Sequence, residues 1–485
     1  MPATALVEHP TDSERNDFSR WRPSFHIIAP TGWMNDPCGL GYDPATLQYH
    51  IGFQWNPNGA EWGDIVWGNS TSSDLVNWIV APAPTLNRDT AYDRAGVFTG
   101  CFRPTGPDGV RDGTLTYIYT AKLAIATSSD GGKTWYKPAT SPILYGPPEG
   151  VSVTSWRDPY VAPWPTMGKA LGGKYAEGKL FATISGGLVG MTPTVFLYAV
   201  DETDLNKWEY LGPLMDVGLN KRLSHWSGDL GVNWEVSNFM TLDDGQGSSQ
   251  EFLILGAEGC KSIYRQEGSR RTPRGQLWVA GRIKPREDGT GGRALMDYSY
   301  GGVFDHGLLY AANGFWDPET LQQIVIGWVV EEDLPVHLQI RQGWSGCLSL
   351  PRIASLSTIR HIVKARKSDL AVIKSIRAEN DGHGTWTIQT LKISPDRRLR
   401  QLRRLATQTT IAATSLGPLD CTFHVPLKTS RWEFHGEFAV AQSCTCVGLA
   451  IYHSKDLQCS TKLYWSPAEE DFAVERPALV EGDAR

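Results

Sequence analysis

The sequence contains no long apolar run and no recognisable leader. Within its 485 residues no stretch of about 18 consecutive apolar residues occurs, which argues against a transmembrane helix. The N-terminal segment MPATALVEHPTDSERNDFSRW has neither a basic first region nor an apolar core, so it does not match a secretory signal peptide. From these absences we expect no membrane partner and a cytoplasmic protein.

The cysteines lack the spacings of metal or redox sites. No CxxC and no Cys/His pattern occurs, and Cys444 and Cys446 are too closely spaced for a zinc site. The only glycosylation sequon, Asn69-Ser70-Thr71, lies in a tryptophan-rich stretch where a glycan would block a pocket. Both features favour the cytosol. We interpret all eight cysteines as reduced thiols: Cys38, Cys101, Cys260, Cys347, Cys421, Cys444, Cys446 and Cys459.

The sequence also has no large excess of either positive or negative charge. The net charge is −6, and basic residues are scattered until 352–404, where they become denser without interleaved aromatic residues. Such a stretch is typical of a solvated face, so we do not expect a nucleic-acid partner. Hydrophobic residues make up 41% of the chain, which is enough for a large core. At this length we expect more than one domain, although propellers and barrels are large single units.

Short alternating runs replace helical periodicity along most of the chain. They are separated by Gly, Pro, Asn or Asp and predict an all-β protein. Segments 72–78, 128–135 and 201–208 each place an acidic turn shortly before a tryptophan, which fits repeated four-stranded blades. Ordinary hairpins anchored by a tryptophan are the alternative. The clearest runs are 48–55, 114–121, 194–200, 251–257 and 322–330.

A change of composition follows 341-RQGWSGCLSLPRI-353. Plainer strands are predicted beyond it at 385–391, 433–441 and 447–453, most simply as a β-sandwich. The predicted boundaries are a tail at 1–20, a large β-domain at 21–353, a linker at 354–366 and an incomplete sandwich at 367–485.

The stretch 33-WMNDPCGLGYDP-44 places Asp36 between an asparagine and a proline. A surface turn is one interpretation, because Asn, Asp, Pro and Gly favour turns. However, Trp55, Trp62 and Trp67 follow closely, with amide side chains between them. Indole faces suit sugar rings, and buried indole N–H groups need partners. We therefore predict a carbohydrate pocket.

Three acids stand in unusual settings: Asp36, Asp158 in 155-SWRDPYV-161, and Glu235 in 232-VNWEVSNF-239. Glycoside cleavage normally needs one carboxylate as nucleophile and one as general acid, and a third carboxylate held by an arginine can bind ring hydroxyls. From the residues alone, a structural Arg157–Asp158 pair and a solvent-facing Glu235 stay open as alternatives.

The ordered motifs resemble glycoside hydrolase family 32, which contains β-fructofuranosidases, inulinases and fructosyltransferases. The resemblance covers roughly residues 20–353 and continues more faintly to the end. It implies a five-bladed β-propeller followed by a β-sandwich. The motifs are WMNDPCG, FQWNPNG, EWGDIVWGNSTSSDLVNW, GVFTGCF, RDPY, WEVSNF and QGWSGCLSLPR.

The resemblance also implies roles for individual residues. Asp36 corresponds to the nucleophile, Asp158 to the transition-state stabiliser and Glu235 to the acid/base. No metal and no organic cofactor is implied. The positions that match the lining of the fructose pocket are Asn35, Gln54, Trp62, Phe98, Thr99 and Arg157.

Several positions depart from the commonest family pattern. Cys38 stands in place of an asparagine, Asn69 in place of a histidine, and Val236 in place of a cysteine. Thr99-Gly100-Cys101 replaces Ser-Gly-Ser. A loop that relatives carry within 117-YIYTAKLAIATSSD-130 is missing here. Cys38 and the FQWNP form resemble the fungal fructosyltransferase branch, which favours transfer over hydrolysis.

We therefore expect a retaining enzyme that acts on sucrose and related β-fructofuranosides and forms short fructo-oligosaccharides. Cys38 cannot order a water as an amide would, so Cys38→Asn is expected to favour hydrolysis. A purely hydrolytic invertase or inulinase, a non-catalytic sugar-binding propeller and a protein-interaction scaffold are the alternatives. The candidates for binding the sugar acceptor are Trp55, Asn56, Asn58 and Trp62.

Overall fold

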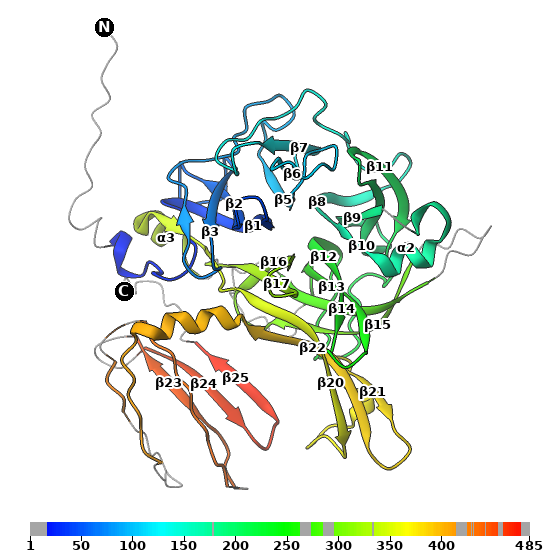
Figure 1. Cartoon of the computed structure of the whole chain (residues 1–485). Coiled ribbons are helices and arrows are strands. Elements are labelled where there is room, and N and C mark those ends of the chain that lie inside the picture. Colours follow the sequence, from blue (N-terminus) through cyan, green and yellow to red (C-terminus); the bar gives the residue numbers. More distant parts are fainter. Residues whose placement is uncertain are drawn as a thin grey trace. The chain divides into compact units, whose positions relative to one another are not determined.

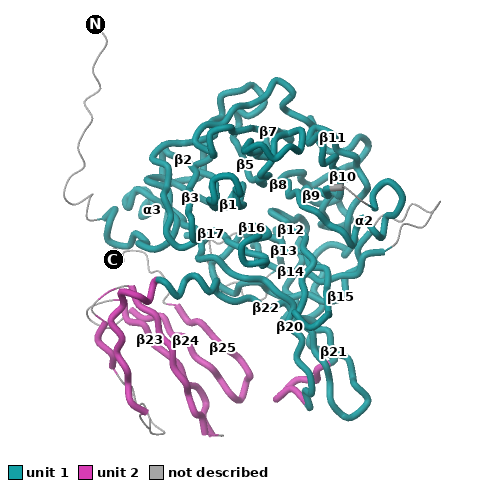
Figure 2. The backbone as a smooth tube through the Cα atoms, viewed as in Figure 1, with its two compact units in different colours: residues 1–363, 371–401 teal, residues 364–370, 402–485 magenta. Residues whose placement is uncertain are grey.

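The computed structural model divides the chain into two compact units, shown in Figure 2. Unit 1 comprises residues 1–363 and 371–401, and unit 2 comprises 364–370 and 402–485. The structure describes residues 17–176, 179–261, 273–284, 295–331, 334–413, 424–427, 429, 431–441, 443–453 and 459–476. Most of the predicted tail, residues 1–16, therefore lies outside the described residues.

Unit 1 contains five sheets of mainly antiparallel strands arranged around a centre (Figure 1). The first contains β1 (Gly32–Asp43), β2 (Gln48–Asn56), β3 (Val66–Ser72) and β4 (Ile79–Val80). The second contains β5 (Phe98–Arg103), β6 (Leu115–Thr120) and β7 (Leu123–Ser128). The third contains β8 (Val153–Pro163), β9 (Lys179–Leu188), β10 (Thr192–Asp201) and β11 (Asp204–Pro213).

The fourth sheet contains β12 (Asn233–Asp243), β13 (Ser249–Glu258), β14 (Arg274–Ile283) and β15 (Met296–Asp305). The fifth contains β16 (Leu309–Asp317), β17 (Gln322–Val329), β20 (Arg352–Ile362), β22 (Trp386–Pro395) and β21 (Arg377–Asn380), with β19 (Cys347–Leu348) beside β17. Helices are short: α2 (Pro165–Leu171), α3 (Val336–Gln342) and three 3₁₀ turns at Gly173–Tyr175, Leu370–Val372 and Arg397–Leu405. No helix among the described residues has the length and apolar character needed to cross a bilayer.

The five sheets form a closed propeller. Each innermost strand contacts the next one around the ring, in the order β1, β5, β8, β12 and β16, and β16 contacts β1 again. The ring is closed by β18 (Trp344–Ser345), which pairs in parallel with the start of β1 through Gly32 and Trp33. The predicted all-β, five-bladed fold is confirmed.

Aromatic side chains fill the space between neighbouring blades. Trp67 of the first blade meets Tyr117 of the second edge to face, with ring centroids 4.8 Å apart. Phe252 and Trp278 of the fourth blade share a core with Leu356 of the fifth. Because both faces of each sheet pack against other residues, the strands read as nearly continuous apolar runs.

The predicted acidic turns recur at equivalent places in three blades. Asp74 follows β3 and accepts a hydrogen bond from the backbone N–H of Asn77 at 2.8 Å. Asp130 follows β7 and binds the N–H of Thr134 at 2.9 Å. Asp201 ends β10 and binds the N–H of Thr203 at 3.0 Å. The repeated acidic turns in the sequence therefore mark the turn after the third strand of a blade.

The segment of the second blade in which the sequence analysis expects a missing loop forms a tight hairpin. Strands β6 and β7 are joined by Ala121 and Lys122, and Thr120 pairs directly with Leu123. Lys122 adopts φ = 59°, which is the left-handed conformation that short hairpin loops require. The blade closes without the longer loop.

The predicted linker at 354–366 is wrong over its first nine positions, because β20 occupies Arg352–Ile362. Ile353, Ala354 and Leu356 are buried there and complete the fifth blade. The compositional change at 353 misled the prediction, since the strand remains paired while its later side chains become polar. Strand β22, predicted for the sandwich, also belongs to unit 1.

The described residues of unit 2 hold one three-stranded sheet with the order β23 (Val447–Tyr452), β24 (Ser460–Ser466) and β25 (Asp471–Glu475). The predicted strand at 447–453 is confirmed. Residues 433–441, also predicted as a strand, have no regular structure. Of the predicted sandwich at 367–485, residues 371–401 belong to unit 1 and the remainder to unit 2.

Candidate active site

Every innermost strand carries a register shift where it meets its neighbour. The shifts lie at Met34–Pro37 in β1, Phe98–Gly100 in β5, Arg157–Pro159 in β8, Glu235–Asn238 in β12 and Tyr310–Asn313 in β16. A bulge redirects the side chains beside it and is common next to functional sites. The five bulges place the three predicted acids near one another inside the ring.

Asp36 lies in the β1 bulge and is bound by three donors. Its Oδ1 accepts a hydrogen bond from Asn35 Nδ2 at 3.2 Å. Its Oδ2 accepts one from Gln54 Nε2 at 3.2 Å and one from the Thr99 hydroxyl at 2.5 Å. All three donors were among the predicted pocket residues, and all three are buried. They fix the orientation of the carboxylate.

The environment raises the pKa of Asp36 to about 6. Burial is the largest cause, because it disfavours the charged form, and the negative charge of Glu235 acts in the same direction. The hydrogen bond from Thr99 and the charge of Arg274 oppose the shift. A carboxylate that is ionised at neutral pH but weakly solvated suits a nucleophile.

Asp158 is held in a strained segment of β8. It is 5% exposed and adopts φ = 62°, a conformation that is uncommon outside glycine. Its N–H donates to the Thr120 hydroxyl at 2.7 Å, and its Oδ2 accepts from the N–H of Val236 at 3.1 Å. Burial raises the pKa of Asp158 well above its usual value, despite the nearby charge of Arg157.

Val236 itself adopts φ = 44°, which is a rare conformation for a β-branched residue. Its amide reaches Asp158 only in this bulged geometry. The hydrogen bond from the Val236 amide therefore links Asp158 on β8 to the strained segment of β12 that carries Glu235.

Glu235 has both carboxylate oxygens engaged. Its Oε1 accepts two hydrogen bonds from Arg157, from Nε at 3.0 Å and from an Nη at 2.5 Å. Its Oε2 accepts one from the Tyr310 hydroxyl at 2.8 Å. The Glu235 side chain is 18% exposed, so the alternative of a solvent-facing strand residue is excluded.

Arg157 binds Glu235 and Glu258 instead of forming a simple pair with Asp158. Its guanidinium lies 2.9 Å from Glu258 Oε2, whereas the nearest Asp158 oxygen is 4.0 Å away. Asn233 Nδ2 also donates to Glu258 at 2.7 Å. Burial and the charge of Glu235 raise the pKa of Glu258. The alternative of an isolated Arg157–Asp158 turn is therefore wrong.

The sequence analysis missed Glu258, Arg274 and Tyr310. Glu258 ends the buried run of β13 directly opposite Asn233 in the register, and an acid at the end of an apolar strand was the available signal. Arg274 lies over the Tyr310 ring, with its guanidinium carbon 4.3 Å from the ring centroid. Nothing in the plain segments around Arg274 and Tyr310 marks them without the three-dimensional register.

Trp62 and Phe98 form an aromatic wall. Their rings are nearly parallel, with an interplanar angle of 7° and centroids 6.4 Å apart. Trp62 is 61% exposed, so its face is accessible to a ligand. Phe98 directly precedes Thr99, which binds the Asp36 carboxylate. The wall therefore borders Asp36.

Two of the predicted acceptor residues and Cys38 face the core. Trp55 is buried and its indole N–H donates to the Thr31 carbonyl at 2.7 Å, and the buried Asn56 donates to the Glu61 carbonyl at 2.8 Å. Cys38 is fully buried between the first two blades, with its thiol 3.3 Å from the Asp36 carbonyl oxygen. The Cys38 side chain is not exposed to solvent in the structure, and the expected effect of Cys38→Asn on the ratio of transfer to hydrolysis stays a prediction.

Sequence comparison finds two domains of one family along the chain. The profile described as the N-terminal domain of glycosyl hydrolases family 32 matches residues 26–365, and the profile of the C-terminal domain matches 398–484. The acid β-fructofuranosidase of Vigna radiata is 29% identical over 356 residues, which are 71% of this chain and 49% of that protein. The acid β-fructofuranosidase of Vicia faba is 28% identical over 82% of this chain and 58% of its own length. The chain thus spans about half the length of the curated relatives it matches.

Solved structures show the same fold. The Aspergillus kawachii β-fructofuranosidase complexed with glycerol superposes with a TM-score of 0.76 at 24% identity, over 99% of this chain and 83% of that chain. The fructosyltransferase of A. japonicus gives a TM-score of 0.65 at 24% identity, over 81% of this chain and 70% of that chain. Together with the two domain matches, these findings establish that the chain belongs to glycosyl hydrolase family 32.

Proposed function

We propose that the protein is a retaining β-fructofuranosidase that cleaves sucrose and related fructosides and transfers the fructosyl group to water or to a sugar. The observation that carries the proposal is the meeting of Asp36, Asp158 and Glu235, which stand on the bulges of β1, β8 and β12. The charge of Glu235 raises the pKa of both aspartates, which requires the three carboxyl groups to be close.

In the first step the Asp36 carboxylate attacks the anomeric C2 of the fructosyl unit. The bond from C2 to the bridging oxygen breaks, and Glu235 transfers its proton to that oxygen as glucose leaves. Asp158, buried beside both groups, accepts hydrogen bonds from ring hydroxyls. In the second step Glu235 takes a proton from the incoming hydroxyl, which attacks C2 and releases Asp36.

The network around Glu235 supports both of its roles. Arg157 and Tyr310 donate to it and so stabilise the carboxylate that acts as base in the second step. Arg157 is shared with Glu258, so the guanidinium does not neutralise Glu235 alone. This arrangement lets Glu235 exchange its proton between the two steps.

Transfer to a sugar belongs to the same proposal. Water is present at about 55 M, so an acceptor sugar competes only if the protein holds it in line, where effective molarities reach roughly 10⁵ M. The exposed Trp62 offers a face for this acceptor, and Asn58 is the exposed amide nearby in sequence. Trp62→Ala is therefore expected to lower the ratio of transfer to hydrolysis, and an unchanged ratio would remove Trp62 from this role.

A cytoplasmic location remains part of the proposal. The seven cysteines in the described part of the chain form no disulfide with one another, which supports a reducing compartment. Fractionation of cells that produce the full-length protein tests this, and recovery from the medium would contradict it.

Incubation with concentrated sucrose tests the function. Release of glucose in excess of fructose indicates transfer, and equal release indicates hydrolysis. Loss of glucose release in Asp36→Asn, with an unchanged circular dichroism spectrum, supports the assignment. Well-folded protein that binds sucrose by calorimetry but releases no glucose would instead indicate a sugar-binding propeller.

A further inference from the structure

A buried asparagine on β16 binds the backbone beside Asp36. Asn313 Nδ2 donates a hydrogen bond to the carbonyl oxygen of Pro37 at 3.0 Å and lies 3.5 Å from that of Gly100. Pro37 directly follows Asp36, and Gly100 directly follows Thr99, whose hydroxyl binds the Asp36 carboxylate. Asn313 therefore ties the β16 bulge to the bulges of β1 and β5.

A second buried asparagine makes the same kind of contact beside Glu235. Asn238 Nδ2 donates to the carbonyl oxygen of Val236, the residue that follows Glu235, at 3.2 Å. Val236 is the residue that β12 holds at φ = 44°. Asn238 Oδ1 accepts a hydrogen bond from the N–H of Gly314 on β16 at 2.7 Å. Asn238 therefore joins the strained segment of β12 to β16.

One backbone amide connects the two asparagines. The N–H of Gly314 is shared between Asn238 Oδ1 at 2.7 Å and Asn313 Oδ1 at 3.0 Å. Because both amide oxygens face this donor, both side-chain NH₂ groups are left to bind carbonyl oxygens. A Cβ atom on Gly314 would lie 2.8 Å from the carbonyl oxygen of Ile324, so this close approach requires glycine.

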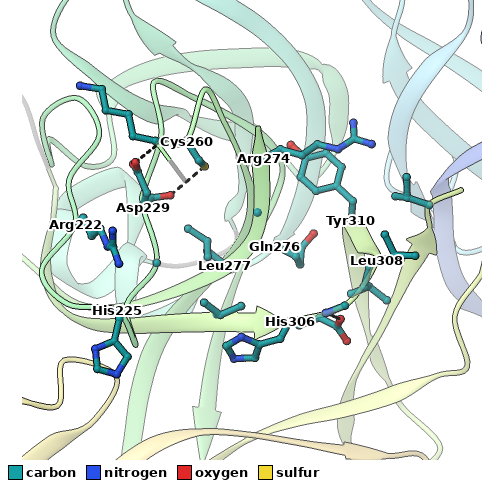
Figure 3. A pocket seen from close by; sticks show the side chains of 18 residues that line it. Arg222, His225, Asp229, Cys260, Arg274, Gln276, Leu277, His306, Leu308 and Tyr310 are labelled. Carbon is teal, nitrogen blue, oxygen red and sulfur yellow. Dashed lines mark hydrogen bonds between the residues drawn. The ribbon is translucent and has the colours of Figure 1, made fainter. Parts of the chain in front are cut away.

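A third buried amide supports β16 from the fourth blade. Gln276 on β14 accepts a hydrogen bond from the N–H of Ala312 at 3.0 Å and donates one to the carbonyl oxygen of Leu255 at 2.9 Å. Gln276 and Tyr310 both line the cavity drawn in Figure 3. Strand β16 is thus tied to four other strands where its own pairing with β17 is interrupted, between Tyr310 and Asn313.

Strand β16 lies between the strands that carry Asp36 and Glu235. In the closed ring its neighbours are β12, with Glu235, and β1, with Asp36. A bulge leaves backbone groups without a ladder partner, and such groups need another partner when they are buried. Each asparagine supplies this partner at the residue after a functional side chain. The same hydrogen bonds therefore also fix where the two carboxyl groups lie.

We propose that Asn313 and Asn238 are positioning residues that set the separation of Asp36 and Glu235. Asn313 acts on Asp36 and on its donor Thr99, and Asn238 acts on Glu235. The two carboxyl groups of a retaining glycosidase lie about 5 Å apart, and a displacement of roughly 1 Å can slow a reaction about 10²-fold. The inference rests on the proposed function, in which these two groups act together.

Two substrates separate the roles of the two asparagines in the full-length protein. Sucrose requires the nucleophile and a proton from Glu235, whereas β-fructosyl fluoride requires only the nucleophile, because fluoride leaves without a proton from the protein. Asn238→Ser should lower kcat/KM for sucrose at least about tenfold and that for β-fructosyl fluoride less than about threefold. Asn313→Ser should lower both values at least about tenfold. A general loss of structure would not distinguish the substrates in Asn238→Ser.

The pH profile is a second measurement for Asn313. The hydrogen bond from Thr99 lowers the pKa of Asp36, which is about 6 in the fold. Asn313→Ser releases the carbonyl of Gly100 and should weaken the Thr99 bond. The acid limb of kcat/KM for β-fructosyl fluoride is then expected to move to higher pH.

Asn69→Ser is the matched control. Asn69 is buried on the regularly paired strand β3, and its Nδ2 lies 3.5 Å from the carbonyl oxygen of Gly132, away from the innermost strands. The control should change kcat/KM for both substrates less than about threefold and leave the acid limb in place.

An equal fall in kcat/KM for both substrates in Asn238→Ser, or an unmoved acid limb in Asn313→Ser, would overturn the inference while the proposed function stands. Asn238→Ser alone is sufficient if Asn313→Ser does not fold. If the wild-type protein cleaves neither substrate, the proposed function fails, and crystal structures of the variants decide instead. Displacement of Asp36 in Asn313→Ser and of Glu235 in Asn238→Ser supports the positioning roles, whereas unmoved carboxyl groups contradict them.

Discussion

The innermost strand of each blade pairs irregularly with its neighbour, whereas the second and third strands of the same blades pair residue for residue. Strand β12 shifts register between Glu235 and Asn238, while β13 and β14 pair without interruption from Glu251 to Glu258. The same contrast separates β8 from the β9–β10 pair. Bulges orient functional side chains, and regular ladders bury apolar ones.

This contrast assigns different consequences to substitutions in the two regions. Three bulges hold Asp158, Val236 and Ala311 at positive φ, and two buried aspartates have raised pKa values. The bulged region therefore lowers stability in exchange for a preorganised site. Changes there should alter activity far more than stability, and changes in the regular strands should do the reverse.

The largest effect is expected from Asp36→Asn. Loss of the proposed nucleophile should lower kcat/KM for sucrose by roughly 10⁴-fold or more. Asp43→Asn, at the far end of the same strand, is the matched control. Asp43 binds the N–H of Ala45 at 2.9 Å and the Thr46 hydroxyl at 2.6 Å, so its loss should cost about 1 kcal/mol of stability without changing kcat/KM. Equal kcat/KM values in the two variants would contradict the contrast between the bulge and the regular end of β1.

A core substitution in a regular strand should have the opposite profile. Phe252 on β13 is fully buried among residues of the fourth and fifth blades. Phe252→Ala should lower the free energy of unfolding by about 3–5 kcal/mol, with kcat/KM per folded molecule changed less than about threefold. Denaturant unfolding and kinetics at low temperature measure both quantities. A large fall in kcat/KM with an unchanged free energy of unfolding would contradict the separation of functional bulges from stabilising regular strands.

Removing the Asp36 charge should also stabilise the protein at neutral pH. The pKa of Asp36 is about 6 in the fold, against an ordinary value of 3.8. Between these pH values the folded protein retains a proton that the unfolded chain releases, so the free energy of unfolding falls as pH rises. The free energy of unfolding of Asp36→Asn does not fall in this way. It should exceed that of the wild-type protein by on the order of 1–2 kcal/mol at about pH 7, with no such difference near pH 4. Thermal unfolding of the variant and the wild-type protein at both pH values measures this difference. A variant that is less stable than the wild type at pH 7 would refute the expectation.

The smallest effect concerns the support of Glu235. Tyr310→Phe removes the hydroxyl that donates to Oε2 at 2.8 Å and retains the ring beneath Arg274. We expect kcat for sucrose to fall about tenfold with little change in KM, because the proton-transferring group is less well oriented. A rise in KM at constant kcat would show that Tyr310 contacts the sugar instead.

The sequence was sufficient to predict the blades and to single out three acids that the structure brings near one another. Short apolar runs between turn residues predict most of the strands, and the acidic residues Asp74, Asp130 and Asp201 mark the turn after the third strand of a blade. Asp36, Asp158 and Glu235 stand in motifs whose order is specific. The clustering of these acids follows from the closed ring of inner strands.

Other parts of the site depend on register and could not be predicted. Tyr310 and Glu258 reach the acids only because bulges shift β16 and β12 relative to their neighbours. No glycine marks the positive φ of Asp158 or Val236, so the strained backbone is invisible in the sequence. The end of the fifth blade was also missed, because β20 continues after its composition turns polar.

Trapping the covalent intermediate tests the central claim most directly. In Glu235→Ala, β-fructosyl fluoride should still react, because fluoride leaves without a proton from the protein, whereas release of the fructosyl group is slow without the base. Peptide mass spectrometry is then expected to find one fructosyl residue on Asp36, absent when Asp36→Asn is added. A fructosyl residue on another side chain, or no adduct from a wild-type protein that cleaves sucrose, would contradict the assignment of Asp36 as nucleophile.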